Sequence, residues 1–287
     1  MIITSRNALL TFTPAILALG LITACGQIAS KDSAVKVTNG VEDSATDHPS
    51  TVLLVMNLPQ GQGLCTGTFV NDHQVVTAGH CVEGLDRANP AMVFAVEKDG
   101  KFAPGPHALS YERNPEYSID KGVSQYDVSV ITFPANSAPG ITPLASEAPS
   151  VGTEFTIIGF GNNKDFMENG TLNGSGAGVK REGKNTVQAL QDGMIVFAGL
   201  SGTETVDAAD VGTNVSSGEG DSGGPMLIGN KLVGVTSGGG FAKGPDGADI
   251  SVSEYVDLNN PVNKKFLAGA LHKTSRATPT LISNAGL

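Results

Sequence analysis

Three polar residues in distinctive local contexts could together carry out acyl-transfer chemistry. His80 lies in "VVTAGHC", Asp127 in "YDVSVITF" and Ser222 in "EGDSGGP". A serine hydroxyl is a weak nucleophile at neutral pH unless a neighbouring base takes its proton during attack. Histidine titrates in the right range to be that base, and a carboxylate can hold its ring in one tautomer. The chain therefore offers the residue types of a serine hydrolase, in the order His, Asp, Ser.

The loop around Ser222 is unusually rich in glycine. Residues 216–225 read "SSGEGDSGGP", with four glycines and two acids. Glycine allows positive φ and close approach of another group to the main chain. The composition thus indicates a loop whose backbone meets a ligand. A plain surface loop is the alternative, which Asp221 in the middle of the segment disfavours.

The elements that must position these residues read as short strands. Apolar runs recur between Gly, Pro, Asn and Asp positions, and Gly (37) with Pro (15) is frequent, which favours an all-β chain. The Pro-rich residues 133–152 predict a crossing between two β halves. Residues 161–185 are expected to form a long surface loop. A helix is predicted at about 260–272, capped by Asn259 or Asn260, with a flexible tail at 273–287.

The amino-terminal residues are predicted to be a targeting segment. An apolar run at 8–22 follows Arg6 and is shorter than the roughly 18 to 20 apolar residues of a membrane-spanning helix. Its layout is that of a secretory signal peptide, here residues 1–24. "ITAC" resembles the lipobox of bacterial lipoproteins, which implies lipidation of Cys25; an ordinary signal peptide with a chance Cys is the alternative. Residues 25–36 then read as a tether or propeptide.

Composition limits the partners. The formal net charge is −10 and the pI about 4.9, which disfavours nucleic-acid binding, because phosphate contacts need clustered Lys and Arg. No cofactor or metal is predicted, since no HExxH or Cys/His ligand spacing occurs; a structural calcium ion at residues 97–112 stays open. We expect a monomer.

The three contexts and their chain order strongly resemble the chymotrypsin-like (trypsin-like) serine proteases, over residues 37 to about 272. "CTGTF" and "TAGHC" are similar to the family's first disulfide, which implies a Cys65–Cys81 bond and leaves Cys25 for the lipid. The resemblance implies two six-stranded antiparallel β-barrels, at about 37–140 and 141–258, and a C-terminal α-helix. The active site would lie between the barrels and act on a protein or peptide substrate.

The resemblance also implies site roles. Ser222 would be the nucleophile, His80 the base and Asp127 the group that orients it. The N–H groups of Gly220 and Ser222 would form the oxyanion hole. Ser237 would hydrogen-bond Asp127, and a segment would pair with the substrate backbone, namely Ser237, Gly238 and Gly239.

Activation is expected to follow cleavage between Lys36 and Val37. "VTNGVEDSATDHPSTVLL" is similar to the family's mature amino terminus, whose ammonium would pair with Asp221. The precursor would then be an inactive zymogen, held at the cell envelope by Cys25 and released into the periplasm or medium by cleavage. The alternative is that "AVKVTNG" is only a linker and a strand.

The resemblance implies that the floor of the primary specificity pocket is Ser216, six residues before Ser222. Trypsin-like cleavage after Lys or Arg would need an Asp there, so Ser216 favours an apolar or small side chain, as in chymotrypsin- or elastase-like enzymes. Glu219 at the rim could still attract a basic side chain. An enzyme of this kind would not cut after Lys36 efficiently, so another protease is expected to activate it. Alternatives are a non-catalytic homologue that binds partners through the cleft and a serine esterase; Thr236 disfavours a glutamate-specific enzyme.

Overall fold

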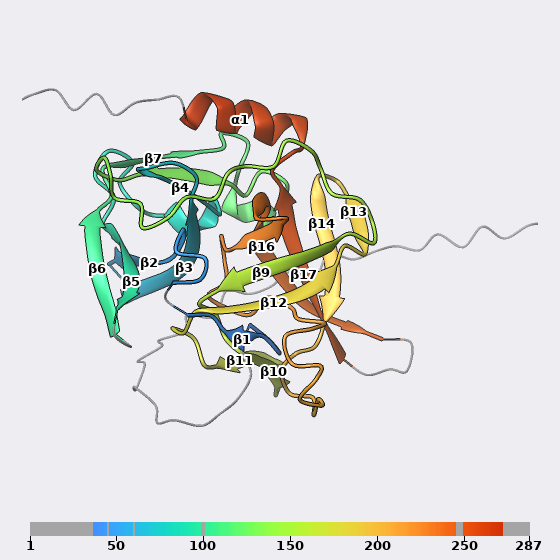
Figure 1. Ribbon diagram of the computed structural model, residues 1–287. Coiled ribbons are helices and arrows are strands. Elements are labelled where there is room, and N and C mark those ends of the chain that lie inside the picture. The colour runs from blue at the N-terminus through green and yellow to red at the C-terminus, as the bar shows by residue number, and fades with distance from the viewer. Residues whose placement is uncertain (1–36, 45, 60, 99–100, 245–248, 272–287) are drawn as a thin grey trace, which may run out of the picture. The chain divides into compact units, whose positions relative to one another are not determined.

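A computed structural model describes residues 37–44, 46–59, 61–98, 101–244 and 249–271 (Figure 1). The predicted signal peptide, Cys25, the tether, Lys36 and the tail at 273–287 lie outside the described residues. Strands dominate, and the described part of the chain has one α-helix, at its carboxyl-terminal end. None of its helices combines the length and the apolar character needed to span a membrane.

The first sheet closes into a barrel because one of its strands is bent. β6 pairs with β5 at one edge of the sheet and β7 with β8 at the other, and only Ala108 and Leu109 separate β6 from β7. β6 and β7 thus act as one strand that joins both edges, which gives six strands in all. The strands are β2 (Thr51–Leu58), β3 (Gly61–Phe69), β4 (Gln74–Thr77), β5 (Met92–Lys98), β6 (Lys101–His107), β7 (Ser110–Arg113) and β8 (Ser129–Thr132).

The second sheet closes in the same way. β12 pairs with β9 and β13 with β14, and two residues, Val187 and Gln188, connect β12 to β13. Counting β12 and β13 as one bent strand gives a second six-stranded barrel, so the predicted fold is confirmed. A two-residue strand of the amino-terminal segment, β1, is added to β12. The strands are β1 (Val41–Glu42), β9 (Glu154–Gly159), β12 (Arg181–Thr186), β13 (Ala189–Gln191), β14 (Met194–Gly199), β15 (Pro225–Ile228), β16 (Lys231–Lys243) and β17 (Asp249–Asp257).

Strand β8 is buried on both faces. Ile131 lies in the core of the first barrel, whereas Val130 packs in a cluster with residues of the second barrel, such as Leu232. The helix α1 (Pro261–Leu271) adds Leu267 to that cluster. Its cap is Asn260, whose Oδ1 accepts a hydrogen bond from the N–H of Val262 at 3.0 Å. Successive side chains of β8 therefore pack in two different cores.

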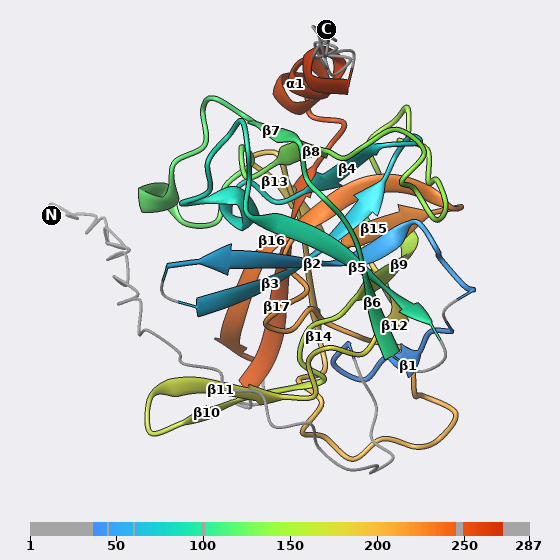
Figure 2. The ribbon, with the colours of Figure 1, turned by 90° about the vertical axis from the view of Figure 1, so that its left-hand side faces the viewer.

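The prediction of a long loop at 161–185 is wrong. β10 (Lys164–Glu168) and β11 (Thr171–Ser175) form an antiparallel hairpin, which projects at the lower edge of Figure 2. Its turn is Asn169–Gly170, with φ of 53° and 76°. Positive φ at both central residues defines the type I′ turn, for which Asn-Gly is the preferred pair. Most residues of both arms are exposed, so the apolar alternation that marks a half-buried strand is missing.

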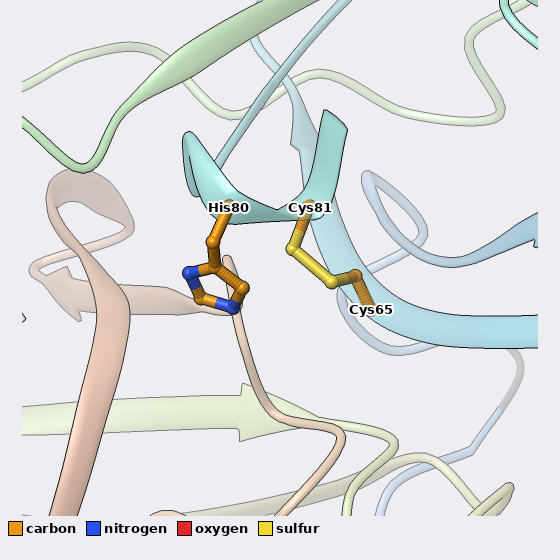
Figure 3. Close-up of side chains that lie close together, drawn as sticks. All are labelled: Cys65, His80 and Cys81. Atoms are coloured by element: carbon orange, nitrogen blue, oxygen red, sulfur yellow. A yellow bond between two sulfur atoms is a disulfide. The ribbon is translucent and has the colours of Figure 1, made fainter. Parts of the chain in front are cut away.

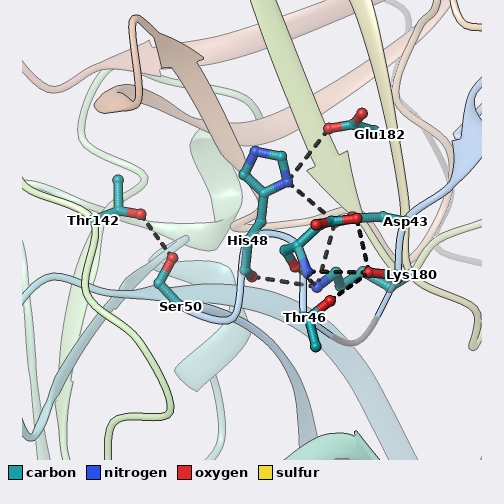
Figure 4. Close-up of polar contacts among 9 residues, drawn as sticks. Asp43, Thr46, His48, Ser50, Thr142, Lys180 and Glu182 are labelled. Atoms are coloured by element: carbon teal, nitrogen blue, oxygen red, sulfur yellow. Dashed lines mark hydrogen bonds and ion pairs between the residues drawn. The ribbon is translucent and has the colours of Figure 1, made fainter.

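A polar cluster ties the amino-terminal segment to β12 (Figure 4). His48 Nδ1 lies 3.2 Å from Asp43 Oδ2 and 3.3 Å from Glu182 Oε2. The Lys180 ammonium lies 3.3 Å from the same Asp43 oxygen, and the side chain of Asp43 is almost completely buried. The hydrogen bond that the Asp43 carboxylate accepts from His48 is the main cause that raises the pKa of His48 above its ordinary value. Protonated His48 thus bridges two carboxylates.

This cluster predicts a pH-dependent stability. Because the folded-state pKa of His48 is raised, its contribution is complete below the unfolded value of about 6.5 and is lost as pH rises through the folded value. We expect the stability difference between wild type and His48→Gln to be largest at pH 6 and smaller by up to about 1 kcal/mol at pH 8.5, given partial solvent screening. Urea unfolding at both pH values measures it. Parallel pH profiles for the two proteins would contradict it.

Candidate active site

His80 and Asp127 meet because they lie at neighbouring strand ends. His80 follows β4 and opens a short 3₁₀ helix, and Asp127 precedes β8, which pairs with β4. Asp127 Oδ2 accepts a hydrogen bond from His80 Nδ1 at 2.8 Å, and Oδ1 accepts one from the His80 N–H, also at 2.8 Å. One carboxylate therefore fixes both the main chain and the ring of His80.

The Asp127 carboxylate is buried and receives a third donor from the second barrel. Ser237 Oγ, on β16, donates to Asp127 Oδ2 at 2.6 Å, so the structure makes the contact that the resemblance implies. Three hydrogen bonds thus hold this buried carboxylate in one orientation. We assign the proton of neutral His80 to Nδ1, because that atom faces the carboxylate. Nε2 is then an acceptor on a side chain that is 26% exposed.

Ser222 lies next to the segment that carries His80. Its carbonyl oxygen accepts a hydrogen bond from the Thr66 N–H at 2.8 Å. Thr66 follows Cys65, and the predicted Cys65–Cys81 disulfide is present, which joins this strand to the residue after His80. Figure 3 shows the imidazole and the disulfide side by side below the 3₁₀ helix. Ser222 is among the residues that line a cavity.

A buried carboxylate, Asp221, organises the main chain before Ser222. Oδ1 accepts a hydrogen bond from the Gly161 N–H and Oδ2 one from the Gly218 N–H, each at 2.8 Å. Asp221 is 2% exposed, and burial raises the pKa of Asp221 to about 7 although the two N–H groups lower it. Gly220, which directly precedes Asp221, has a φ of 99°, a conformation that residues with a side chain rarely adopt. The turn at 218–222 therefore depends on where the Asp221 carboxylate sits.

The cavity beside Ser222 has a volume of about 190 Å³. Gly238 and Gly239 from β16 line it, as the resemblance implies for the substrate strand. Ser216 is not among the lining residues. It is completely buried, and its hydroxyl group hydrogen-bonds Ser251 Oγ at 2.7 Å and the Leu200 carbonyl oxygen at 2.9 Å.

Two acids line the same cavity, of which the sequence indicated only Glu219. The other is Asp165 on β10, whose Oδ1 accepts a hydrogen bond from Asn162 Nδ2 at 3.1 Å. Burial raises the pKa of Asp165 to about 6. No sequence signal could have placed it here, because its position depends on the fold of the hairpin.

A family model described as Trypsin matches residues 37–259. The chain belongs to the trypsin family. It is 32% identical over 241 residues to a trypsin of Saccharopolyspora erythraea, which covers 77% of this chain and 96% of that protein. It is 27% identical to trypsin iota of Drosophila melanogaster, over 61% of this chain and 68% of that one. With a cercarial protease of Schistosoma mansoni it shares 26% identity, over 67% and 76%.

Membership of the trypsin family makes the chain a serine endopeptidase, a hydrolase that acts on protein or peptide substrates. The described residues contain two groups that could in principle hold a metal ion. In the first, Cys65 and Cys81 are joined as a disulfide, so their sulfurs cannot be thiolate ligands. In the second, around His48, the ammonium of Lys180 already neutralises Asp43. Neither group suits a cation.

Proposed function

We propose that Ser222, His80 and Asp127 form the catalytic triad of this serine endopeptidase. The observation that carries the proposal is the Asp127 carboxylate, which two barrels supply with three hydrogen bonds while it holds His80 Nδ1. An ionised, buried carboxylate against Nδ1 stabilises the imidazolium that forms when Nε2 takes a proton. The side chain of His80 is 26% exposed, so its second ring nitrogen remains accessible for proton transfer.

The chemistry follows from these positions. As Ser222 Oγ bonds to the substrate carbonyl carbon, its proton moves to His80 Nε2 and the carbonyl oxygen becomes an oxyanion. We assign the N–H groups of Gly220 and Ser222 to that oxyanion; one such donor contributes about 3 to 4 kcal/mol in the transition state. His80 then protonates the leaving amine as the peptide C–N bond breaks. Water, deprotonated by the same nitrogen, hydrolyses the acyl-enzyme.

We propose further that the enzyme is made as a zymogen cleaved between Lys36 and Val37. The Val37 side chain is 1% exposed and packs in the core of the second barrel, with φ of 41°. Positive φ is strained for a β-branched residue. Cleavage would remove the preceding carbonyl group and so the strain, and would create an ammonium group that can pair with buried Asp221.

Location follows from the same cleavage. The exported precursor would carry its lipid on Cys25, and cleavage at Val37 would leave that lipid on the removed segment. The disulfide cannot retain the enzyme at the membrane, because Cys65 pairs with Cys81 inside the barrel. Active enzyme that remains attached to membranes and still contains Cys25 would exclude release by cleavage.

Specificity is proposed to favour small or apolar side chains before the scissile bond. Support comes from the lack of an acid at position 216 and from the uncharged Ser217 and Ser251 in the cavity wall. A peptide library tests this: wild type is expected to cut after small or apolar residues. Cleavage after Lys or Arg that Asp165→Asn or Glu219→Gln abolishes would instead assign specificity to the acids in the cavity wall.

A fluorophosphonate probe tests the proposed triad. Such a probe phosphonylates an activated serine, so we expect labelling of the form that begins at Val37, at Ser222 alone, as located by peptide mass. Ser146→Ala, at an exposed serine, is the matched control and should label like wild type. A folded protein that is not labelled would favour the non-catalytic homologue. Labelling without peptide cleavage would favour the esterase.

A further inference from the structure

The largest completely buried side chain of the described residues is a charged one, Arg181 on β12. Its Nη1 donates to the carbonyl oxygens of Val179 at 2.8 Å and Gly161 at 3.4 Å. Nε and Nη2 have no acceptor among the described residues. These two nitrogens form one edge of the guanidinium plane, the edge that binds a carboxylate through two parallel hydrogen bonds. A buried arginine without a partner on that edge is costly, so an acceptor that reached the edge would be stabilised there.

A carboxylate lies within reach of this edge. Arg181 pairs with Gly159 across β12 and β9, so their side-chain positions point to the same face. Gly159 has no side chain, and Asp221 Oδ1 lies 1.9 Å from the place that a Cβ would occupy. Directly opposed Cβ positions are about 5 Å apart, a span that the arginine side chain covers easily. Both groups also meet at Gly161, whose N–H binds Asp221 and whose carbonyl oxygen accepts from Arg181.

We propose that Arg181 is a positioning residue that captures the Asp221 carboxylate in the precursor. The inference rests on the proposed activation at Val37. In the captured state, Asp221 leaves the N–H groups of Gly161 and Gly218 and binds the free edge of Arg181. The turn at 218–222 then loses the anchor that directs the Gly220 N–H at the oxyanion.

Cleavage shifts the balance between the two states. The ammonium group of Val37 would offer Asp221 a second cation, in addition to the backbone N–H groups of Gly161 and Gly218 that it already binds. The other charged groups that act on the pair are Asp165, which repels Asp221, and Glu42, the cross-strand partner of Arg181 on β1. Arg181 therefore sets how inactive the precursor is, whereas the catalytic groups set how active the cleaved enzyme is.

The experiment compares two forms of the protein. One is the precursor with Lys36→Gln, which keeps the bond intact, and the other begins at Val37. Each is prepared as wild type, Arg181→Met and Lys184→Met, the last a control that removes an exposed cation from the same strand. The readout is the second-order rate of fluorophosphonate labelling, expressed as the ratio of the Val37 form to the precursor. Urea unfolding confirms that every form is folded.

We expect Arg181→Met to speed labelling of the precursor, which lowers the ratio about tenfold or more, because a captured state that loses its cation is depopulated. Arg181→Lys should give an intermediate ratio, since lysine supplies charge without the two-pronged edge. Lys184→Met should leave the ratio unchanged. A merely structural Arg181 would slow both forms and leave the ratio alone, which would overturn the proposal, as would a slower precursor.

Two further outcomes separate this inference from the proposed function. A wild-type Val37 form that is not labelled contradicts the triad itself. Equal labelling of wild-type precursor and Val37 form contradicts the zymogen and the captured state together. Should Arg181→Met not fold, Arg181→Gln, which keeps a buried donor, is assessed by the same ratio.

Discussion

Replacement of Ser222 by alanine is expected to lower kcat by about 10⁶, and His80→Ala by a similar factor, because the two groups act in one proton transfer. The double variant should be no worse than either single variant, since each removes the same step. Asp127→Asn should cost about 10⁴, because an amide opposite Nδ1 favours the wrong tautomer of His80. Steady-state cleavage of a peptide substrate by the Val37 form measures all four.

The controls for this series are conservative. His107→Ala removes a histidine that is exposed in the first barrel and should leave kcat unchanged. Each variant should unfold at the wild-type urea concentration within a small margin, because the changes are small in volume. Additive losses in the double variant, or an Asp127→Asn enzyme with full activity, would show that the three side chains do not act as a unit.

The second large effect concerns Asp221. In the Val37 form, Asp221→Asn is expected to lower kcat by about 10²–10³, the usual effect of losing one oxyanion donor, because the carboxylate no longer holds the turn before Ser222. KM should change less, since the cavity walls formed by β16 remain in place. Wild-type precursor should be impaired to a similar degree. Active-site titration followed by steady-state kinetics separates kcat from the fraction of competent enzyme.

The proposed pair of Val37 and Asp221 also predicts the direction in which kcat changes with pH. In the proposed active form, pairing with Asp221 would raise the pKa of the Val37 ammonium above the ordinary α-amino value of about 7.7 to 8.0. The active state is therefore complete below that value and is lost as pH rises through the higher, folded-state pKa. We expect Asp221→Asn to remove this alkaline loss from the profile of kcat. An unchanged alkaline limb in the variant would assign the loss to another group.

His80, Asp127 and Ser222 could be predicted as site residues because each lies in a distinctive local sequence that resembles a motif of the family. The two barrels could be expected from the resemblance, and closure by a bent strand is what makes six strands out of the seven segments β2–β8. The sequence could not show that Asp165 lines the cavity. Asp165 reaches it only because the hairpin folds back, and that hairpin lacks apolar alternation.

The burial of Arg181 could not be predicted from the sequence, for a related reason. In the sequence it sits in "VKREGK", a polar stretch that predicts an exposed loop, and only the pairing of β12 with β9 buries it. The Asn-Gly pair at 169–170 was the signal that could have divided this region into a hairpin and a following strand. Strand pairing over long sequence distances carries the information that local patterns lack.

The hydrogen bond between Ser237 and Asp127 has a consequence for biosynthesis. Ribosomes release the chain from its amino terminus, so His80 and Asp127 emerge and can fold together while Ser222 and Ser237 do not yet exist. Until β16 has joined the second barrel, Asp127 lacks one of its three donors and the nucleophile has no place beside His80. If Ser222, His80 and Asp127 act as proposed, a nascent chain would thus be unable to digest itself, whatever the state of its amino terminus.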